Sequence, residues 1–394
     1  MPDQPAPTVI FNLGMGVDSA AILLRYLTDP TSRDFDLNEM VVITAMTGDE
    51  FASTGRDVEQ HILPLMRDHN VRYVQVARGR RHVTTAGDGI VILSDTRQPH
   101  QVHLNGAYKL STEMLEAGTI PQSGGARLCS VHAKGDALDP IIAQITAGRP
   151  YRQIIVFEAN EPKRADKDAG YNTALRTGMY PLIEWGWNRQ RCIDYIQTIT
   201  GIVWEKSACT GCPFSFQNTE SRVRLMGRYR ETPDAGIDTL FMEHVALCLN
   251  PTQGLVSGKR AADIIHAAGL TEVTDGLADR LNHTGHAIYE VRRILRPRND
   301  DPTKMANAAR SVTAIAAGTR TEMLAELDRL ATELHTVVTT GDDNIGRVHI
   351  RTRGTTFPTV EQFYVVCPDV VLDKQHTKFD SWWTTATATE LAAA

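Results

Sequence analysis

Short apolar runs recur through the first half of the chain, and segments of mixed polarity separate them. The runs cover residues 9–11, 40–44, 71–76, 89–93 and 153–157. Several are continuously apolar, which is typical of strands buried on both faces of a parallel sheet, and the segments between them have helical spacing. This alternation predicts an α/β fold with a doubly wound, mostly parallel sheet.

The pattern changes beyond residue 231, where prolines and glycines interrupt the chain and no further buried parallel strand is evident. Residues 261–268, 281–295 and 320–337 have the spacing of amphipathic helices, and residues 347–371 contain short β-like runs. We therefore expect a first domain over residues 1–250 and a smaller, mainly helical domain over residues 251–394.

The composition is that of an ordinary globular protein, with 42% hydrophobic and 22% charged residues in a chain of 394. The beginning of the chain has no basic segment followed by an apolar run, and no stretch of about 18 apolar residues occurs. We expect a cytoplasmic protein with no membrane partner. The formal net charge of −6 argues against a whole-surface affinity for nucleic acid, but it leaves a local basic groove open.

The first apolar run leads into the turn Gly14-Met15-Gly16-Val17-Asp18-Ser19, and an apolar, helix-like segment follows. Glycines let backbone N–H groups approach a ligand closely, and a helix N-terminus adds partial positive charge. This combination favours a phosphate or pyrophosphate group. The turn matches neither GxxxxGK(S/T) nor GxGxxG, so it is not one of the two common nucleotide loops. A turn that serves only strand–helix packing is the alternative.

The turn resembles the SGGxDS loop of the N-type ATP pyrophosphatases and of the phosphoadenosine phosphosulfate (PAPS) reductase-like family. Gly14 stands where the family pattern has serine, and Met15 stands where it has the first glycine, whereas Gly16, Asp18 and Ser19 agree with it. The resemblance covers residues 8–216 and implies an adenine nucleotide alpha hydrolase-like fold. It also implies ATP and Mg²⁺ as cofactors, with the pyrophosphate held by the turn.

Two further segments resemble the family in the same order along the chain, and a third, polar segment follows a later apolar run at the same sheet edge. Thr47-Gly48-Asp49-Glu50 follows the second apolar run and resembles the acidic turn beside the nucleotide. Arg127 and Lys134 bracket Cys129 and resemble the residues that neutralise phosphate charge. Arg164 follows the run that ends at residue 157 and is placed to contact ribose or phosphate. Each segment taken alone also fits a solvated surface turn.

Cys209-Thr210-Gly211-Cys212 is the clearest metal-like feature of the sequence. Two thiolates at this spacing can reach one metal, and a proline after the last cysteine is common beside iron–sulfur clusters. The resemblance implies Cys129 as the third ligand of a 4Fe-4S cluster, with zinc as the alternative metal. Cys192, Cys248, His132 or no protein group would complete the site. A dithiol redox pair and coincidence are the other interpretations.

Two enzyme classes and one binding class fit these features. A sulfonucleotide (PAPS or APS) reductase needs a nucleophilic cysteine on a mobile tail, and no cysteine follows Cys367. A PP-loop ATP pyrophosphatase fits better, and it would adenylylate an acceptor for sulfur transfer with Asp18, Ser19 and Lys134 as catalytic residues. A cysteine desulfurase is then a candidate sulfur donor, and a nucleic acid or small metabolite is a candidate acceptor. The third class is a nucleotide-binding module without turnover.

Overall fold

The computed structural model describes residues 7–121, 128–256, 258–301, 303, 304, 306, 308–355 and 357–393. The chain divides into two units. The first unit comprises residues 1–111 and 126–212, and the second comprises residues 112–125 and 213–394. Among the described helices, none combines the length and the apolar character needed to cross a membrane.

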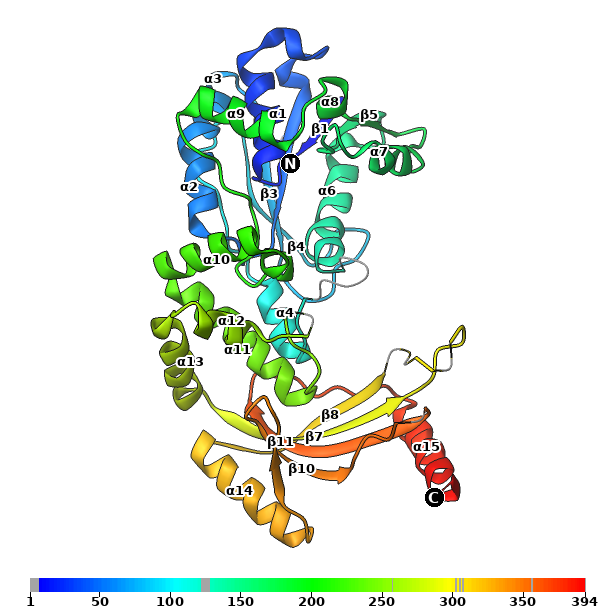
Figure 1. Cartoon of the computed structure of the whole chain (residues 1–394). Helices are drawn as coiled ribbons and strands as arrows, with labels where there is room; N and C mark the ends of the chain where they lie inside the picture. Colours follow the sequence, from blue (N-terminus) through cyan, green and yellow to red (C-terminus); the bar gives the residue numbers. More distant parts are fainter. Residues whose placement is uncertain are drawn as a thin grey trace. The chain divides into compact units, whose positions relative to one another are not determined.

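A mostly parallel sheet forms the centre of the first unit (Figure 1). Its described strands follow the order β4-β3-β2-β1-β5-β6 and have the bounds β1 Val9–Asn12, β2 Met40–Met46, β3 Arg72–Arg78, β4 Ile90–Thr96, β5 Tyr151–Ile154 and β6 Arg176–Met179. The strands pair in parallel, except that β4 runs antiparallel to β3 at one edge. The predicted mostly parallel α/β sheet is confirmed.

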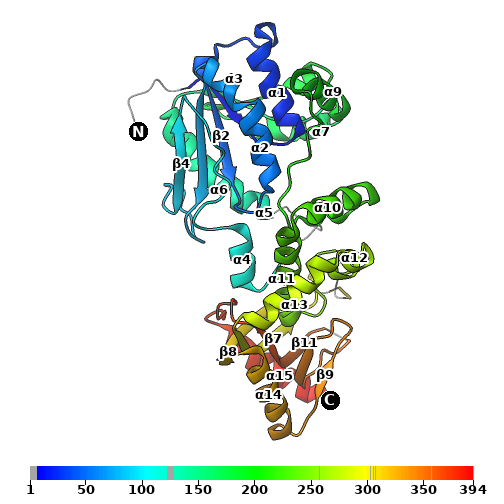
Figure 2. The same cartoon turned by 90° about the vertical axis from the view of Figure 1, so that its left-hand side faces the viewer.

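Helices cover both faces of this sheet, as the doubly wound pattern predicts (Figures 1 and 2). Val9 and Phe11 of β1 pack with the helices of one face, whereas Ile10 packs with the other. The first face carries α1 Val17–Thr28, α2 Ala52–His61, α3 Leu63–Asp68 and α9 Arg189–Thr200, and the second carries α6 Asp136–Thr146. The shorter elements are η1 Pro30–Ser32, η2 Leu37–Glu39, α5 Leu128–Ser130, η3 Val131–Gly135, α7 Pro162–Ala169 and α8 Pro181–Glu184. Helix α4, Leu110–Ala117, begins in the first unit, and its residues from Thr112 onward belong to the second.

An antiparallel sheet forms the centre of the second unit (Figure 1). Its described strands follow the order β8-β7-β11-β10-β9 and have the bounds β7 His286–Leu295, β8 Ala309–Gly318, β9 Val338–Thr340, β10 Gly346–Arg351 and β11 Thr359–Pro368. The surrounding helical elements are η4 Pro213–Phe216, α10 Thr219–Glu231, α11 Pro233–Leu249, α12 Ala261–Ala267, α13 Thr271–His283, α14 Arg320–Glu333 and α15 Phe379–Ala393. The C-terminal half of α11 packs on one face of the sheet, and α14 packs on the opposite face.

The second unit corrects two expectations from the sequence. The expected helix over residues 281–295 is wrong, because α13 ends at His283 and β7 begins at His286. Both faces of β7 are covered, so its apolar residues do not alternate and their spacing also fits a helix. The unit boundary follows Cys212 and not residue 250, because α11 packs on the antiparallel sheet. The expected mainly helical region therefore contains a substantial sheet.

Candidate functional site

The glycine-rich turn connects β1 to α1 at the carboxyl edge of the parallel sheet. Met15 has a φ of 58°, which is the left-handed region that favours glycine. Its side chain is buried, and its carbonyl oxygen accepts a hydrogen bond of 3.1 Å from Trp204 Nε1. Gly16 is the N-cap of α1, so the free N–H groups of the first helical turn lie next to it. The backbone at Met15 thus keeps the conformation for which a glycine is suited.

The segment from Trp204 to Ser207 covers this turn. Ser207 Oγ donates a hydrogen bond of 3.0 Å to the carbonyl oxygen of Gly14. A β-carbon on Gly16 would lie only 2.8 Å from the same hydroxyl oxygen, so a glycine fits where a larger residue would displace Ser207. The chain then continues directly to the Cys209 to Cys212 motif.

The turn after β2 lies against that motif. Glu50 and Cys209 form an isolated antiparallel bridge, and Thr210 N donates a 2.8 Å hydrogen bond to the Asp49 carbonyl oxygen. The hydroxyl oxygen of Thr47 is 3.3 Å from Cys209 Sγ. The structure therefore brings the Thr47 to Glu50 turn and Cys209 together, and the chain leads from Cys209 back to the residues that cover the glycine-rich turn.

The acidic side chains of the second turn have partners inside the protein. Asp49 accepts hydrogen bonds from the backbone N and the hydroxyl of Ser111, at 2.7 and 2.6 Å. Burial raises the pKa of Asp49, and the Ser111 hydrogen bonds only partly offset that effect. Glu50 accepts bonds from the backbone N of Thr47 and Gly48 and lies 3.7 Å from Lys134 Nζ. Lys134 therefore lies beside this turn, with Glu50 as its counter-ion.

Asp18 forms an ion pair with Arg189, the first residue of α9. The Asp18 carboxylate is largely buried, which raises its pKa, and the charge of Arg189 only partly offsets this effect. Glu158 Oε1 lies 4.0 Å from the Arg189 guanidinium. Asp18 Oδ1, Arg189 Nε and Asn12 Oδ1 are buried without a hydrogen-bond partner. Since buried polar atoms are normally paired, these three are candidates to bind polar groups of a ligand.

Ser19 and Arg164, which were also predicted to bind the nucleotide, have hydrogen-bond or ion-pair partners within the protein. Ser19 Oγ donates a 3.0 Å hydrogen bond to the Gly16 carbonyl oxygen, so its hydroxyl stabilises the turn. Arg164 pairs with Glu161 and stacks over Phe157 at 4.3 Å, with more than half of its side chain exposed. Arg127 lies outside the described residues.

In the described part of the chain, the predicted cysteine ligands are not grouped around a common metal position. No group of three or more His, Cys, Asp or Glu side chains in the described ranges is placed to hold a metal ion. Burial and the charge of Glu50 raise the pKa of the Cys209 thiol to about 12, so it is protonated. The candidate fourth ligands Cys192 and Cys248 are buried in hydrophobic clusters. The cluster with Cys129 and Cys212, or its zinc alternative, stays a prediction.

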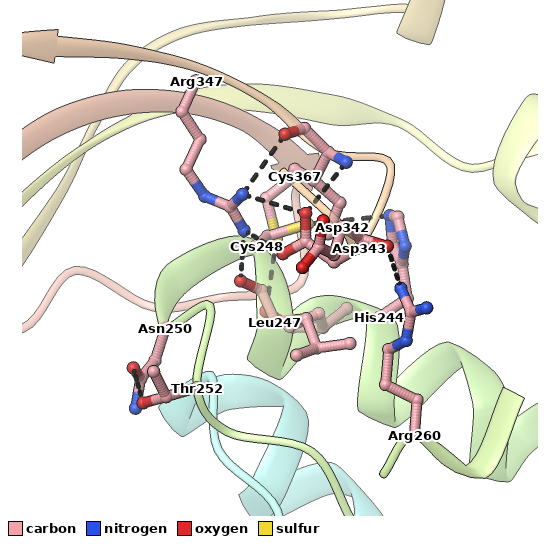
Figure 3. A network of polar contacts seen from close by, with 12 residues as sticks. His244, Leu247, Cys248, Asn250, Thr252, Arg260, Asp342, Asp343, Arg347 and Cys367 are labelled. Atoms are coloured by element: carbon pink, nitrogen blue, oxygen red, sulfur yellow. Dashed lines mark hydrogen bonds and ion pairs between the residues drawn. The ribbon is translucent and has the colours of Figure 1, made fainter. Parts of the chain in front are cut away.

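A second polar cluster lies in the second unit (Figure 3). Arg347 points toward Asp343 and is 2.7 Å from its carboxylate, and it donates another 2.7 Å bond to the carbonyl oxygen of Leu247. His244 Nε2 lies 3.6 Å from Cys248 Sγ, but Cys248 is fully buried and open to no substrate. A pocket of about 770 Å³ adjoins this cluster, and its lining includes none of the predicted site residues.

Sequence reasoning did not find Asn12, Arg189 or Ser207, whereas Glu158 lies in the segment whose carboxylates were predicted to bind Mg²⁺. Arg189 lies 171 residues from Asp18, and no local pattern marks it beyond the Asn188 cap of its helix. Asn12 lies just before the turn, separated from Gly14 by Leu13, and this position is the one sequence feature that could have indicated its role. The chain matches no protein-family model and no curated protein sequence. The arguments for function therefore depend on the residues of this chain.

Proposed function

We propose that the first unit binds ATP at the Gly14 to Ser19 turn and transfers its adenylyl group to an acceptor, as a PP-loop ATP pyrophosphatase with an adenine nucleotide alpha hydrolase-like fold. One observation carries the proposal. Three buried polar atoms without partners, on Asn12, Asp18 and Arg189, lie around a glycine turn that begins a helix at the carboxyl edge of a parallel sheet. This edge is where open α/β sheets bind their ligands.

The backbone of the turn would hold the β- and γ-phosphates of ATP. The N–H groups at the start of α1 have no partner within the helix, and the helix dipole favours negative charge there. Asp18 fits a Mg²⁺ ion, because one of its oxygens is buried and unpaired and Mg²⁺ commonly uses one or two carboxylates together with substrate phosphates. The ion would neutralise phosphate charge when bound. Lys134 would add positive charge if it moved from Glu50 toward the nucleotide.

The proposed reaction forms one bond and breaks one bond at the α-phosphorus. An oxygen of the acceptor attacks this phosphorus, and the bond to the bridging oxygen of pyrophosphate breaks. Pyrophosphate leaves, and the acceptor carries AMP. A sulfur nucleophile, supplied by a donor such as a cysteine desulfurase, then displaces AMP. This step completes thiolation or phosphorothioation. Groups that stabilise the developing charge on the phosphates are the main contribution a protein can make.

The proposal contains no step through an iron–sulfur cluster. Cys129, Cys209 and Cys212 stay the predicted ligands of such a cluster, and Cys209 Sγ lies 3.3 Å from the hydroxyl oxygen of Thr47. The acceptor is left as a class, a nucleic acid or a small metabolite with a nucleophilic oxygen.

A sulfonucleotide reductase is the weaker candidate. The candidate for its nucleophilic cysteine in this sequence is Cys367. Cys367 lies in β11 and is fully buried, with its Sγ 3.9 Å from the Val245 carbonyl oxygen. A cysteine in the centre of a sheet cannot swing to a bound nucleotide.

Equilibrium binding of nucleotides to the purified full chain tests the proposal. Titration calorimetry with ATP and with PAPS, each in the presence of Mg²⁺, should show ATP binding that Asp18→Ala weakens at least tenfold. Pyrophosphate release should follow when ATP is supplied with bulk RNA, DNA or a metabolite extract as acceptor. Asp166→Ala, on the exposed side of α7, is the matched control and should bind ATP as the wild type does.

Exclusive binding of PAPS would favour the reductase, and absence of any nucleotide binding would overturn the proposal. ATP binding without pyrophosphate release from any acceptor would favour the binding module.

A further inference from the structure

Arg189 is a charged side chain at the start of a second helix beside the glycine-rich turn. It is the first residue of α9, after the Asn188 cap, and its backbone N donates a 2.8 Å hydrogen bond to Glu158 Oε2. Its guanidinium pairs with Asp18 and lies 4.0 Å from Glu158 Oε1. The arginine therefore connects the helix that begins at the turn with the loop that follows β5.

In the Asp18–Arg189 ion pair, each side chain has a polar atom that makes no hydrogen bond. Arg189 Nε and Asp18 Oδ1 are both buried and have no partner, and Asn12 Oδ1 beside the turn has none either. The Arg189 side chain is nevertheless 43% exposed, whereas that of Asp18 is 16% exposed. The guanidinium can thus reorient toward the solvent side, while the carboxylate is held in place.

The charge around the turn also lacks balance. Asp18, Glu158 and Glu161 contribute three carboxylates, and Arg189 and Arg164 are the cations in contact with them. A polyphosphate brought to this edge would add more negative charge unless a cation accompanied it. Arginine binds phosphate through a planar fork of donors, and Asp18 is suited to the accompanying cation.

We infer that Arg189 is a phosphate-binding residue that Asp18 holds in the nucleotide-free protein, and that a bound polyphosphate exchanges these partners. The guanidinium passes from the Asp18 carboxylate to pyrophosphate oxygens, and the carboxylate passes to the Mg²⁺ that accompanies them. This inference rests on the proposed function and goes beyond it, because it names the residue that selects polyphosphates over monophosphates.

The test compares ligands that differ only in phosphate number. Wild type, Arg189→Ala, Arg189→Lys and Arg191→Ala are titrated with ATP, AMP and inorganic pyrophosphate, each with Mg²⁺. Arg191 lies on the same helix and is exposed, so Arg191→Ala is the matched control. Arg189→Ala should weaken ATP and pyrophosphate about tenfold or more, which corresponds to one charge-assisted contact. AMP binding should change less than twofold, and Arg189→Lys should restore part of the loss. Circular dichroism verifies that each variant folds.

The outcomes separate the two proposals. If the wild type binds ATP and Arg189→Ala binds ATP equally well, or loses ATP and AMP to the same degree, the inference is overturned and the proposed function stands. If pyrophosphate binds in an Arg189-dependent manner but ATP does not bind, the proposed function fails and the inference stands. If the wild type binds neither ligand, both fail.

Discussion

The Ser207 hydroxyl donates a hydrogen bond to the Gly14 carbonyl oxygen at 3.0 Å, across 193 residues of sequence. The Ser207 hydroxyl oxygen also lies 2.8 Å from the position that a β-carbon on Gly16 would take. Gly16 has φ −87° and ψ 172°, which any residue can adopt, so its own backbone does not require glycine. Met15 has the left-handed backbone instead. Glycine at position 16 is therefore explained by a tertiary contact.

The first prediction concerns this contact. Gly16→Ala should destabilise the protein by about 1 kcal/mol, because the new methyl group forces the Ser207 hydroxyl away from its acceptor. Ser207→Ala should cost a similar amount, and the double variant should cost no more than Ser207→Ala alone. Urea unfolding of the four proteins measures these free energies as a double-mutant cycle.

Gly227→Ala is the control for this cycle, because no atom lies within 4 Å of its added β-carbon on α10. It should be neutral or stabilising, since alanine favours helix more than glycine does. Strictly additive costs for Gly16→Ala and Ser207→Ala would contradict the contact.

The second prediction concerns pH. Burial raises the pKa of Asp18 in the folded protein, so the folded state holds its proton more tightly than the unfolded state does. The contribution of Asp18 to stability is therefore present at low pH and is lost as the pH rises through the raised pKa. Asp18→Asn should be more stable than the wild type at neutral pH without nucleotide, and this advantage should shrink as the pH falls to about 4.

Thermal unfolding across this pH range measures the difference. Asp29→Asn is a control with the opposite sign, because hydrogen bonds from Thr31 lower the pKa of Asp29. Its substitution should cost stability at neutral pH. A pH-independent difference between Asp18→Asn and the wild type would contradict the prediction.

The third prediction concerns the Arg347 cluster. Arg347→Leu should destabilise the second unit by about 3–5 kcal/mol, because it leaves a buried Asp343 carboxylate unpaired. The carbonyl oxygen of Leu247 would also lose the hydrogen bond from Arg347 and keep the one from the backbone N of Asn250. Burial alone would raise the pKa of Asp343, but the hydrogen bond and charge of Arg347 outweigh it and lower the pKa. The stabilisation from this pair is therefore present near neutrality and is lost as the pH falls through the lowered pKa.

Denaturant unfolding at two pH values measures this effect. Arg329→Leu removes an exposed arginine that pairs with Glu326 and Glu333, and it should cost far less stability than Arg347→Leu because solvent screens exposed ion pairs. Equal costs for the two arginines would show that burial does not decide the contribution of Arg347.

The fourth prediction concerns the thiols. Cys209 should react slowly with a maleimide at neutral pH in the native protein, because its raised pKa keeps it protonated and the thiolate is the nucleophile. Glu50→Gln should speed this reaction, since the Glu50 charge contributes to the raised pKa. Peptide mass spectrometry measures the rate at each cysteine, with the fully buried Cys192 as the unreactive reference.

Iron and sulfide analysis of anaerobically purified protein completes this test. Stoichiometric iron together with joint protection of Cys129, Cys209 and Cys212 would support the predicted cluster. Rapid reaction of native Cys209 without Glu50→Gln would contradict the protonated thiol.

The local sequence pattern determined the parallel sheet. Apolar residues dominate β1, β2 and β3, which are buried on both faces, although Thr44 in β2 and Arg72, Gln75 and Arg78 in β3 are buried polar residues. Burial on both faces led to the wrong prediction at β7. Its apolar residues do not alternate with polar ones, and their spacing also fits a helix. Local periodicity is ambiguous when neither face meets water.

The mostly parallel sheet, the glycine turn before α1 and the order of the motifs around it could be predicted from local sequence patterns. The folded chain was needed to show that Arg189 is the partner of Asp18, that Ser207 occupies the space beside Gly16, and that Glu50 pairs with Lys134. These pairs join residues far apart in the chain, so their energies depend on distances that the folded sheet alone creates. A motif records which groups a turn carries, whereas the fold decides which of them are already paired and which are left for a ligand.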